Sequence, residues 1–152
     1  MRNVIKYEVG SNAIEHLIEV INDVELSYNY LKSKTKNKAV KSWIEDKLNY
    51  TTAFKTSALN ILNSLKIKHK KQSNLLLNLR FYWFNIKRFF YKDEEQAIID
   101  ECLKLDTYFL NEVNKEIKSG ILSKPCYKLI NSLKTNLLNT KQAFYFSNLS
   151  IS

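Results

Sequence analysis

Apolar residues recur every three to four positions along most of this chain, which is the spacing of helices that bury one face. The first such segment spans residues 12 to about 32, and Asn12 with Glu15 has the outline of an N-terminal capping box. A polar run, residues 32–38, predicts a short loop, and a second segment then extends from residue 39 to about 65. The predicted core positions of these two helices are Ile14, Leu17, Ile21, Val24, Tyr28 and Leu31, then Val40, Trp43, Tyr50, Phe54, Ile61 and Leu65, with Lys47 and Ser57 at two steps of the second series.

Two further amphipathic segments lie in the second half of the chain. One opens at Asp93, with Gln96 in capping-box register, and is predicted to end at Gly120, the usual residue after a helix C-terminus. The other has Pro125 in its first turn, where a missing N–H breaks no helical hydrogen bond, and extends to about Phe146. The predicted core positions are Ile98, Cys102, Leu105, Phe109 and Val113, then Cys126, Ile130, Leu133, Leu137, Thr140 and Phe144.

A connection of about 27 residues, positions 66–92, separates the second and third helices. Residues 66–74 form a basic linker, and residues 75–90 are apolar on most sides, which predicts a short helix crossing the end or side of the fold. The other two loops are short, so each should join an antiparallel helix pair. The sequence therefore predicts one all-α domain over residues 1–152, an antiparallel four-helix bundle with a ferritin-like arrangement and a long, partly helical crossover.

Three short sequence blocks carry a resemblance to a known family. They are residues 17–23, followed by Tyr28, then residues 97–102 and residues 83–87. Over residues 12–147 the chain resembles the bacterial ferritin-like four-helix-bundle proteins catalogued as domain of unknown function 2383. The resemblance implies the fold far more than an activity, and it also implies an association with stress responses.

The acidic residues and histidines test the metal chemistry that ferritin-like bundles support. A di-iron or di-manganese site takes a Glu from each of two helices and a Glu-x-x-His pair from each of the other two. No Glu-x-x-His occurs, the only histidines are His16 and His69, and the fourth predicted helix has no acidic residue, which excludes a complete site. Glu25 and Glu101 remain candidates for a degenerate one-metal site, and the alternative is that both are solvated or paired with lysines.

Other chemistries lack their residues. Cys102 and Cys126, the only cysteines, fall on apolar stripes without a histidine base, which predicts buried thiols in a reducing compartment. Gly10 and Gly120 alone cannot form a glycine-rich phosphate loop, and no zinc-type cysteine spacing occurs. We therefore expect neither an enzyme nor a cofactor. The first ten residues lack a signal-peptide pattern and no apolar stretch is long enough to span a bilayer, so we expect a cytoplasmic location.

The formal net charge of +9 is unevenly distributed. Residues 47–92 carry ten basic and no acidic residues, whereas residues 93–116 carry eight acidic and two basic ones. Basic groups interleaved with aromatic ones can grip phosphates and stack bases, although the same lysines would also keep an apolar crossover in solution. An acidic membrane surface is a further partner for this zone. The candidate anion or nucleic-acid ligands are Lys66, Lys68, Lys70, Lys71, Arg80, Lys87 and Arg88.

Self-association is a simpler explanation of the apolar crossover and the uneven charge than nucleic-acid or membrane binding. The crossover is more apolar than most surface helices, and the acidic residues 93–116 of one copy could lie against the basic residues 47–92 of another. The sequence thus favours a homodimeric, non-enzymatic bundle with a binding or structural role. The alternatives are a degenerate carboxylate metal-binding protein and a nucleic-acid-binding module that acts through residues 66–92.

Overall fold

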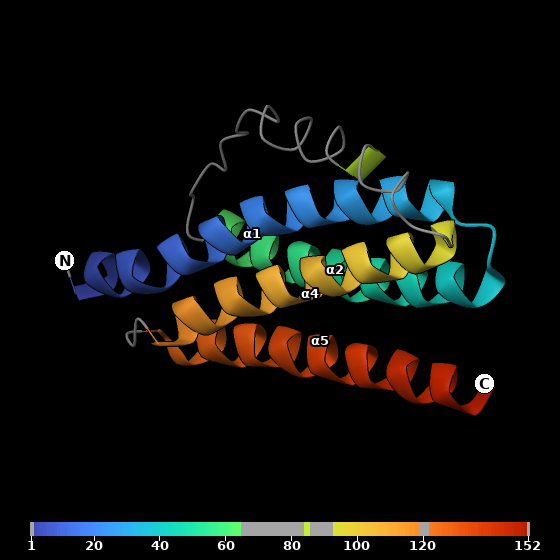
Figure 1. The fold of residues 1–152 in the computed structure, drawn as a ribbon. Coiled ribbons are helices and arrows are strands. Elements are labelled where there is room, and N and C mark those ends of the chain that lie inside the picture. Colours follow the sequence, from blue (N-terminus) through green and yellow to red (C-terminus); the bar gives the residue numbers. More distant parts are fainter. Residues whose placement is uncertain (1, 65–83, 86–92, 119–121, 152) are drawn as a thin grey trace.

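The computed structural model describes residues 2–64, 84–85, 93–118 and 122–151, with side chains described for those between positions 12 and 140. These residues form four long helices, α1 (Arg2–Lys34), α2 (Lys38–Ser64), α4 (Glu94–Lys118) and α5 (Lys124–Ile151), and they contain no strand (Figure 1). The all-α prediction is therefore confirmed. No helix in these ranges combines the length and the apolar character that crossing a membrane would require.

Two helix ends differ from the expected ones. α1 begins at Arg2, so Asn12 lies inside the helix and the predicted capping box at Asn12 is wrong. The single glycine upstream, Gly10, disfavours a helix by only about 1 kcal/mol and does not stop this one. α5 continues to Ile151, past the expected end near residue 146, because no glycine or proline follows Pro125 to break it.

Side-chain caps start α2 and α4. The Oδ1 atom of Asn37 accepts hydrogen bonds from the backbone N–H groups of Ala39 at 2.9 Å and Val40 at 3.3 Å, which satisfies donors that have no intrahelical partner. Asp93 does the same for the N–H of Glu95 at 2.9 Å, so the predicted start of this helix is confirmed. The Gln96 side-chain amide donates along the helix to Oδ1 of Asp100 at 2.9 Å, and the capping-box contact of its oxygen with the backbone of Asp93 stays a prediction.

Glu95 ties the connection between α1 and α2 to the beginning of α4. Its carboxylate accepts a hydrogen bond from the hydroxyl of Thr35 and another, at 2.8 Å, from the backbone N–H of Lys36. A carboxylate in the first turn of α4 also lies at the positive end of the helix dipole. One side chain thus positions the α1–α2 connection against α4.

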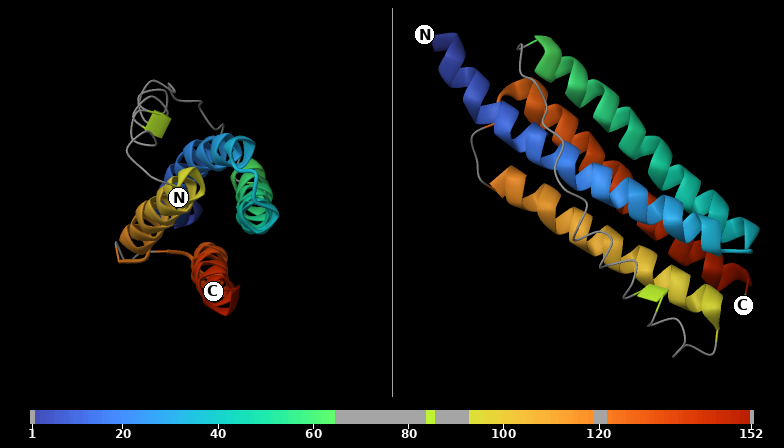
Figure 2. Two further views of the ribbon diagram at one scale, coloured as in Figure 1. Left: turned by 45° about the vertical axis from the view of Figure 1, so that its right-hand side comes forward. Right: turned by 90° about the horizontal axis from the view of Figure 1, so that it is seen from above.

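Each helix packs mainly against two others. α1 and α5 each contact both α2 and α4, so α2 and α4 lie across the core from each other (Figure 2). After each short connection the chain returns along the helix it has just left (Figure 1). Only a minor contact joins α1 to α5 across the core. The space between the four helices is the hydrophobic core.

Most of the predicted core positions are buried. Those on α1 and α4 are all confirmed, as are the first four on α5, while Thr140 is partly exposed and the Phe144 side chain lies outside the described residues. In the second half of the α2 prediction, Phe54 is buried as expected, but Tyr50 and Ile61 are only partly buried and Ser57 is exposed. The predicted core positions were spaced seven residues apart, from 43 to 50 and from 54 to 61. A helix with 3.6 residues per turn drifts away from such a seven-residue repeat, so the later positions rotate out of the core. The buried residues of α2 are instead Val40, Trp43, Ile44, Lys47, Thr51, Phe54, Ala58 and Leu62, with Tyr50 and Ile61 packed at the edge and Leu65 outside the described residues.

Two residues of the predicted crossover are described, and they pack against α1. Phe84 is buried, with its ring edge-on to Tyr30 at a centroid distance of 6.1 Å. The Tyr30 hydroxyl donates a hydrogen bond to the side-chain oxygen of Asn85. Both residues are helical, in agreement with the prediction for this part, and the other positions of the crossover lie outside the described residues.

Candidate functional site

The centre of the core contains an ion pair. Nζ of Lys47 on α2 lies 2.6 Å from Oδ2 of Asp106 on α4, and neither side chain is exposed to solvent. Because α2 and α4 lie across the core from each other, the pair spans the interior and joins helices that barely touch. Burial of two charges costs several kcal/mol each unless geometry and further hydrogen bonds compensate.

Aromatic side chains complete the surroundings of this pair. The Tyr28 hydroxyl on α1 donates to Oδ1 of Asp106, so both carboxylate oxygens accept a hydrogen bond. The Lys47 ammonium lies over the ring of Trp43, 4.2 Å from its centroid, and 5.9 Å from that of Tyr28. The negative face of an aromatic ring attracts such a cation. Trp43 is itself held by α5, since its indole N–H donates to the backbone oxygen of Thr140 at 3.1 Å.

The buried site raises the pKa values of two tyrosines and one cysteine around it. Burial, followed by the negative charge of Asp106, raises the pKa of the Tyr28 hydroxyl well above its ordinary value. The same two causes raise the pKa of Tyr50 and of the Cys102 thiol. Cys102 is completely buried, and a raised pKa favours the thiol over the thiolate, which is the reactive form of cysteine.

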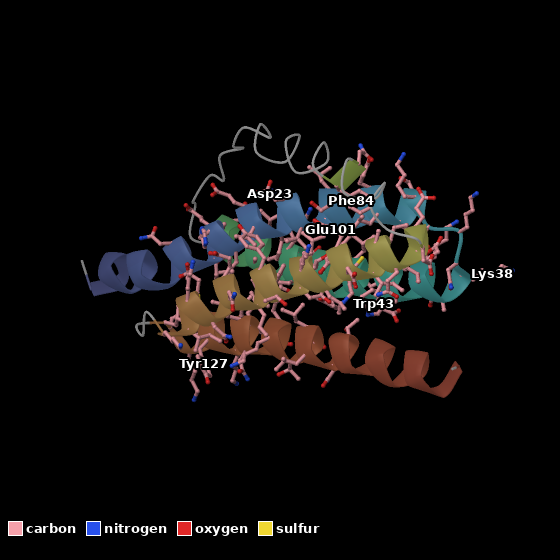
Figure 3. All side chains as sticks on the ribbon, viewed as in Figure 1. Asp23, Lys38, Trp43, Phe84, Glu101 and Tyr127 are labelled. Atoms are coloured by element: carbon pink, nitrogen blue, oxygen red, sulfur yellow. The ribbon has the colours of Figure 1, made fainter. Side chains whose placement is uncertain are left out.

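The two metal-site candidates lie on different helices. Glu25 on α1 faces α2, where its carboxylate accepts hydrogen bonds from Lys55 Nζ at 2.9 Å and the Thr52 hydroxyl at 3.4 Å. Glu101 is partly buried on α4 (Figure 3). In the described part of the chain, no group of three or more His, Cys, Asp or Glu side chains is placed to hold a metal ion. These residues do not fit a ferritin-type metal centre.

His16 links α1 to α4 at the edge of the core. Its Nε2 atom lies 2.9 Å from Oε2 of Glu112 and 4.0 Å from Oε1 of Glu116. Lys115 approaches the other oxygen of Glu112 at 3.1 Å. The hydrogen bond with His16 is the largest of the effects that lower the pKa of Glu112.

The Glu112 pKa predicts an acid-dependent loss of stability. A carboxylate whose folded-state pKa is lowered stabilises the fold above the pH range in which the unfolded residue titrates, and that contribution disappears as the pH falls through the folded pKa. Replacing Glu112 with Gln should therefore lower the free energy of unfolding by up to about 1 kcal/mol at pH 7, and by less at pH 3, for a partly exposed pair. Urea denaturation at both pH values checks this, with the exposed Glu45→Gln as control. A difference that stays constant with pH would contradict the assignment.

Two buried hydroxyls differ from the rest of the site. The oxygens of Ser27 and Tyr50 are inaccessible and have no hydrogen-bond partner among the described residues. Leaving a buried hydroxyl without a partner costs about 1–3 kcal/mol. These groups are therefore positions where the core is not optimised for stability.

Replacing Ser27 with Ala is expected to raise the free energy of unfolding by about 1 kcal/mol, because the change removes this hydroxyl and adds helix propensity. Urea denaturation measures the effect. The matched control is Ser57→Ala on the exposed side of α2, which should gain only the propensity contribution, about 0.5 kcal/mol or less. A Ser27→Ala protein less stable than the parent would contradict the prediction.

The basic candidates of the sequence lie outside the described residues. They are Lys66, Lys68, Lys70, Lys71, Arg80, Lys87 and Arg88. Two basic residues of positions 47–92, Lys47 and Lys55, are described. The charge of Lys47 is neutralised inside the core by an acidic residue of positions 93–116, and Lys55 pairs with Glu25. Both described basic residues of positions 47–92 are therefore paired with acidic residues of other helices.

Sequence reasoning found one half of the central pair and missed the other. Lys47 was noticeable as a charged residue at a core step of α2. Asp106 was not singled out, although it lies four residues after Cys102 and beside Leu105, on the apolar stripe of its helix. Two opposite charges at core positions of two predicted helices were the available signal.

No family model, no curated protein and no solved structure matches this chain. What can be inferred of its function therefore rests on the sequence itself, the fold and the contacts of the central site.

Proposed function

We propose that this protein is a ferritin-like antiparallel four-helix bundle with a non-enzymatic binding or structural role, related to the family of domain of unknown function 2383. The course of the chain supports the architecture: two helix pairs with short connections, separated by the long stretch between Ser64 and Glu94. The family assignment is supported by the three sequence blocks that carry the resemblance. An association with stress responses follows from that resemblance alone.

The ion pair between Lys47 and Asp106 is the observation that carries the non-enzymatic role. In a ferritin-type oxidase the space between the helices is lined by carboxylates and histidines that bind two cations. Here a lysine ammonium lies 2.6 Å from the central carboxylate and balances its charge. A metal ion at the same carboxylate would be repelled by that ammonium and would find too few further ligands among the described residues.

Metal analysis of protein purified without chelators tests this role. We expect iron, manganese and zinc well below one equivalent per chain, and no oxygen consumption after addition of ferrous iron. Stoichiometric metal would instead favour the degenerate carboxylate site. Loss of that metal in a Glu25→Gln, Glu101→Gln double variant would then locate it.

We also propose that the protein acts as a homodimer in the cytoplasm. The charge asymmetry between residues 47–92 and residues 93–116 supports pairing of two copies, and the two unpaired, buried cysteines, Cys102 and Cys126, agree with a reducing compartment. Light scattering should give twice the chain mass at low salt, and a smaller apparent mass as salt screens the charges. A monomer at high concentration and low salt would contradict the dimer.

A further inference from the structure

The groups around the Lys47 nitrogen match what proteins use to bind an organic ammonium ion. A carboxylate oxygen of Asp106 lies at 2.6 Å, the Trp43 ring at 4.2 Å and the Tyr28 ring at 5.9 Å from that atom. A carboxylate together with aromatic faces recognises ammonium groups through charge and cation–π attraction. We propose that the core contains a preorganised site for a primary ammonium ion, in which the side chain of Lys47 is the permanent ligand.

The framework of this site is held by contacts that do not involve Lys47. The Tyr28 hydroxyl donates to Oδ1 of Asp106, and the Trp43 indole N–H donates to the Thr140 backbone of α5. Asp106 and Tyr28 are almost completely buried, so their positions are also set by the surrounding apolar residues. The three groups therefore keep their arrangement when the ammonium is supplied separately from the chain.

The composition of the site selects among cations. A transition metal needs several nitrogen, oxygen or sulfur ligands, and among the described residues no group of three or more His, Cys, Asp or Glu side chains is placed to supply them. A primary ammonium needs a hydrogen-bond acceptor, which Asp106 provides, and aromatic faces can attract its positive charge, which the Trp43 and Tyr28 rings provide. A neutral alcohol of the same size fills the same volume but lacks the charge that Asp106 requires.

Chemical rescue of a Lys47→Ala variant tests the proposal. This change removes the atoms from Cγ to Nζ, which together correspond to n-propylammonium. We expect added n-propylammonium to raise the Tm of the variant by about 4 °C at ten times its dissociation constant. n-Propanol, potassium and manganese should raise it much less. In the matched control Lys55→Ala, which opens a part-exposed pair with Glu25, n-propylammonium should have no such effect.

Two outcomes of the rescue would overturn the site. One is an equal effect of n-propanol and n-propylammonium, because an apolar cavity alone would produce it. The other is a rescue that survives an additional Asp106→Asn change, because the carboxylate would then not be a ligand. If Lys47→Ala folds only when n-propylammonium is present, recovery of helical circular dichroism replaces Tm as the measured quantity.

If no Lys47→Ala protein folds at all, nitrogen NMR of the unaltered protein tests the proposed ammonium site. The Lys47 side chain should give a protonated ammonium signal that exchanges slowly with water and is displaced upfield by the Trp43 ring. A neutral amine, or an ammonium that exchanges as fast as those of exposed lysines, would overturn the proposal. The inference depends only on these contacts, so stoichiometric metal bound elsewhere would refute the proposed function and leave the ammonium site standing.

Discussion

Replacing Lys47 with Met should lower the free energy of unfolding by about 3–5 kcal/mol, the typical effect of removing one partner of a buried ion pair. Met fills much of the volume of the lysine side chain, so little of the loss comes from a cavity. The loss comes from Asp106, whose carboxylate would remain buried without the ammonium that balances its charge. Thermal denaturation should show a Tm lower by about 10 °C.

The control for this experiment is Lys55→Met. Lys55 makes an ion pair of similar length, 2.9 Å, with Glu25, but its side chain is 29% exposed and water can replace the contact. Such pairs contribute about 1 kcal/mol or less. If the two methionine variants lost equal stability, Lys47 would not be the buried partner that the structure describes.

Removing the whole polar cluster should restore the stability that the Lys47→Met change alone removes. In a Tyr28→Phe, Lys47→Met, Asp106→Leu triple variant, no charge and no hydroxyl of the cluster is left without a partner. Replacement of a buried ion pair by apolar residues of similar volume is often neutral or stabilising by about 1–4 kcal/mol. We therefore expect the triple variant to be at least as stable as the parent in urea denaturation.

Comparison with a double variant separates the hydroxyl from the charges. The double variant Lys47→Met, Asp106→Leu should lie about 1–3 kcal/mol below the triple one, because it leaves the buried Tyr28 hydroxyl without its acceptor. A triple variant as unstable as Lys47→Met alone would mean that the loss came from packing of the introduced methionine side chain and not from an uncompensated charge.

If the triple variant is stable, the ion pair serves something other than stability. One role open to it is specificity, since a polar pair in an apolar core penalises arrangements in which its partners do not meet. In this fold the pair connects α2 with α4, which pack against the same two helices but barely against each other. A sliding of either helix by one turn would separate Lys47 from Asp106 and leave both charges buried.

Much of the architecture could be read from the sequence because it depends on local patterns. Helical periodicity predicted the core faces of α1 and α4, and Asp93 and Pro125 marked helix starts through their own backbone chemistry. The failures were also local. An Asn–Glu pattern inside α1 resembled a cap, and strict seven-residue stepping shifted the predicted stripe of α2.

The candidate site was less accessible to the same reasoning. Glu25 was singled out as a metal candidate, but its partner Lys55 became evident only when α1 and α2 were placed side by side. Asp106 was overlooked because one acidic residue on an apolar stripe has no meaning without the residue it meets. The Glu95 link to Thr35 and Lys36 likewise connects segments about sixty positions apart.

By itself, the sequence determined that this chain is helical, where most of its helices face the core, and that it lacks the residues of a complete di-metal site. These properties follow from spacing and composition, which do not depend on how the helices are packed. Tertiary structure alone decided that Lys47 and Asp106 meet, and that Trp43 and Tyr28 surround the ammonium. The role of a charged residue in the core depends on the residue that it contacts. Lys47 and Asp106 are 59 positions apart along the chain, so only the packing of the helices brings them together.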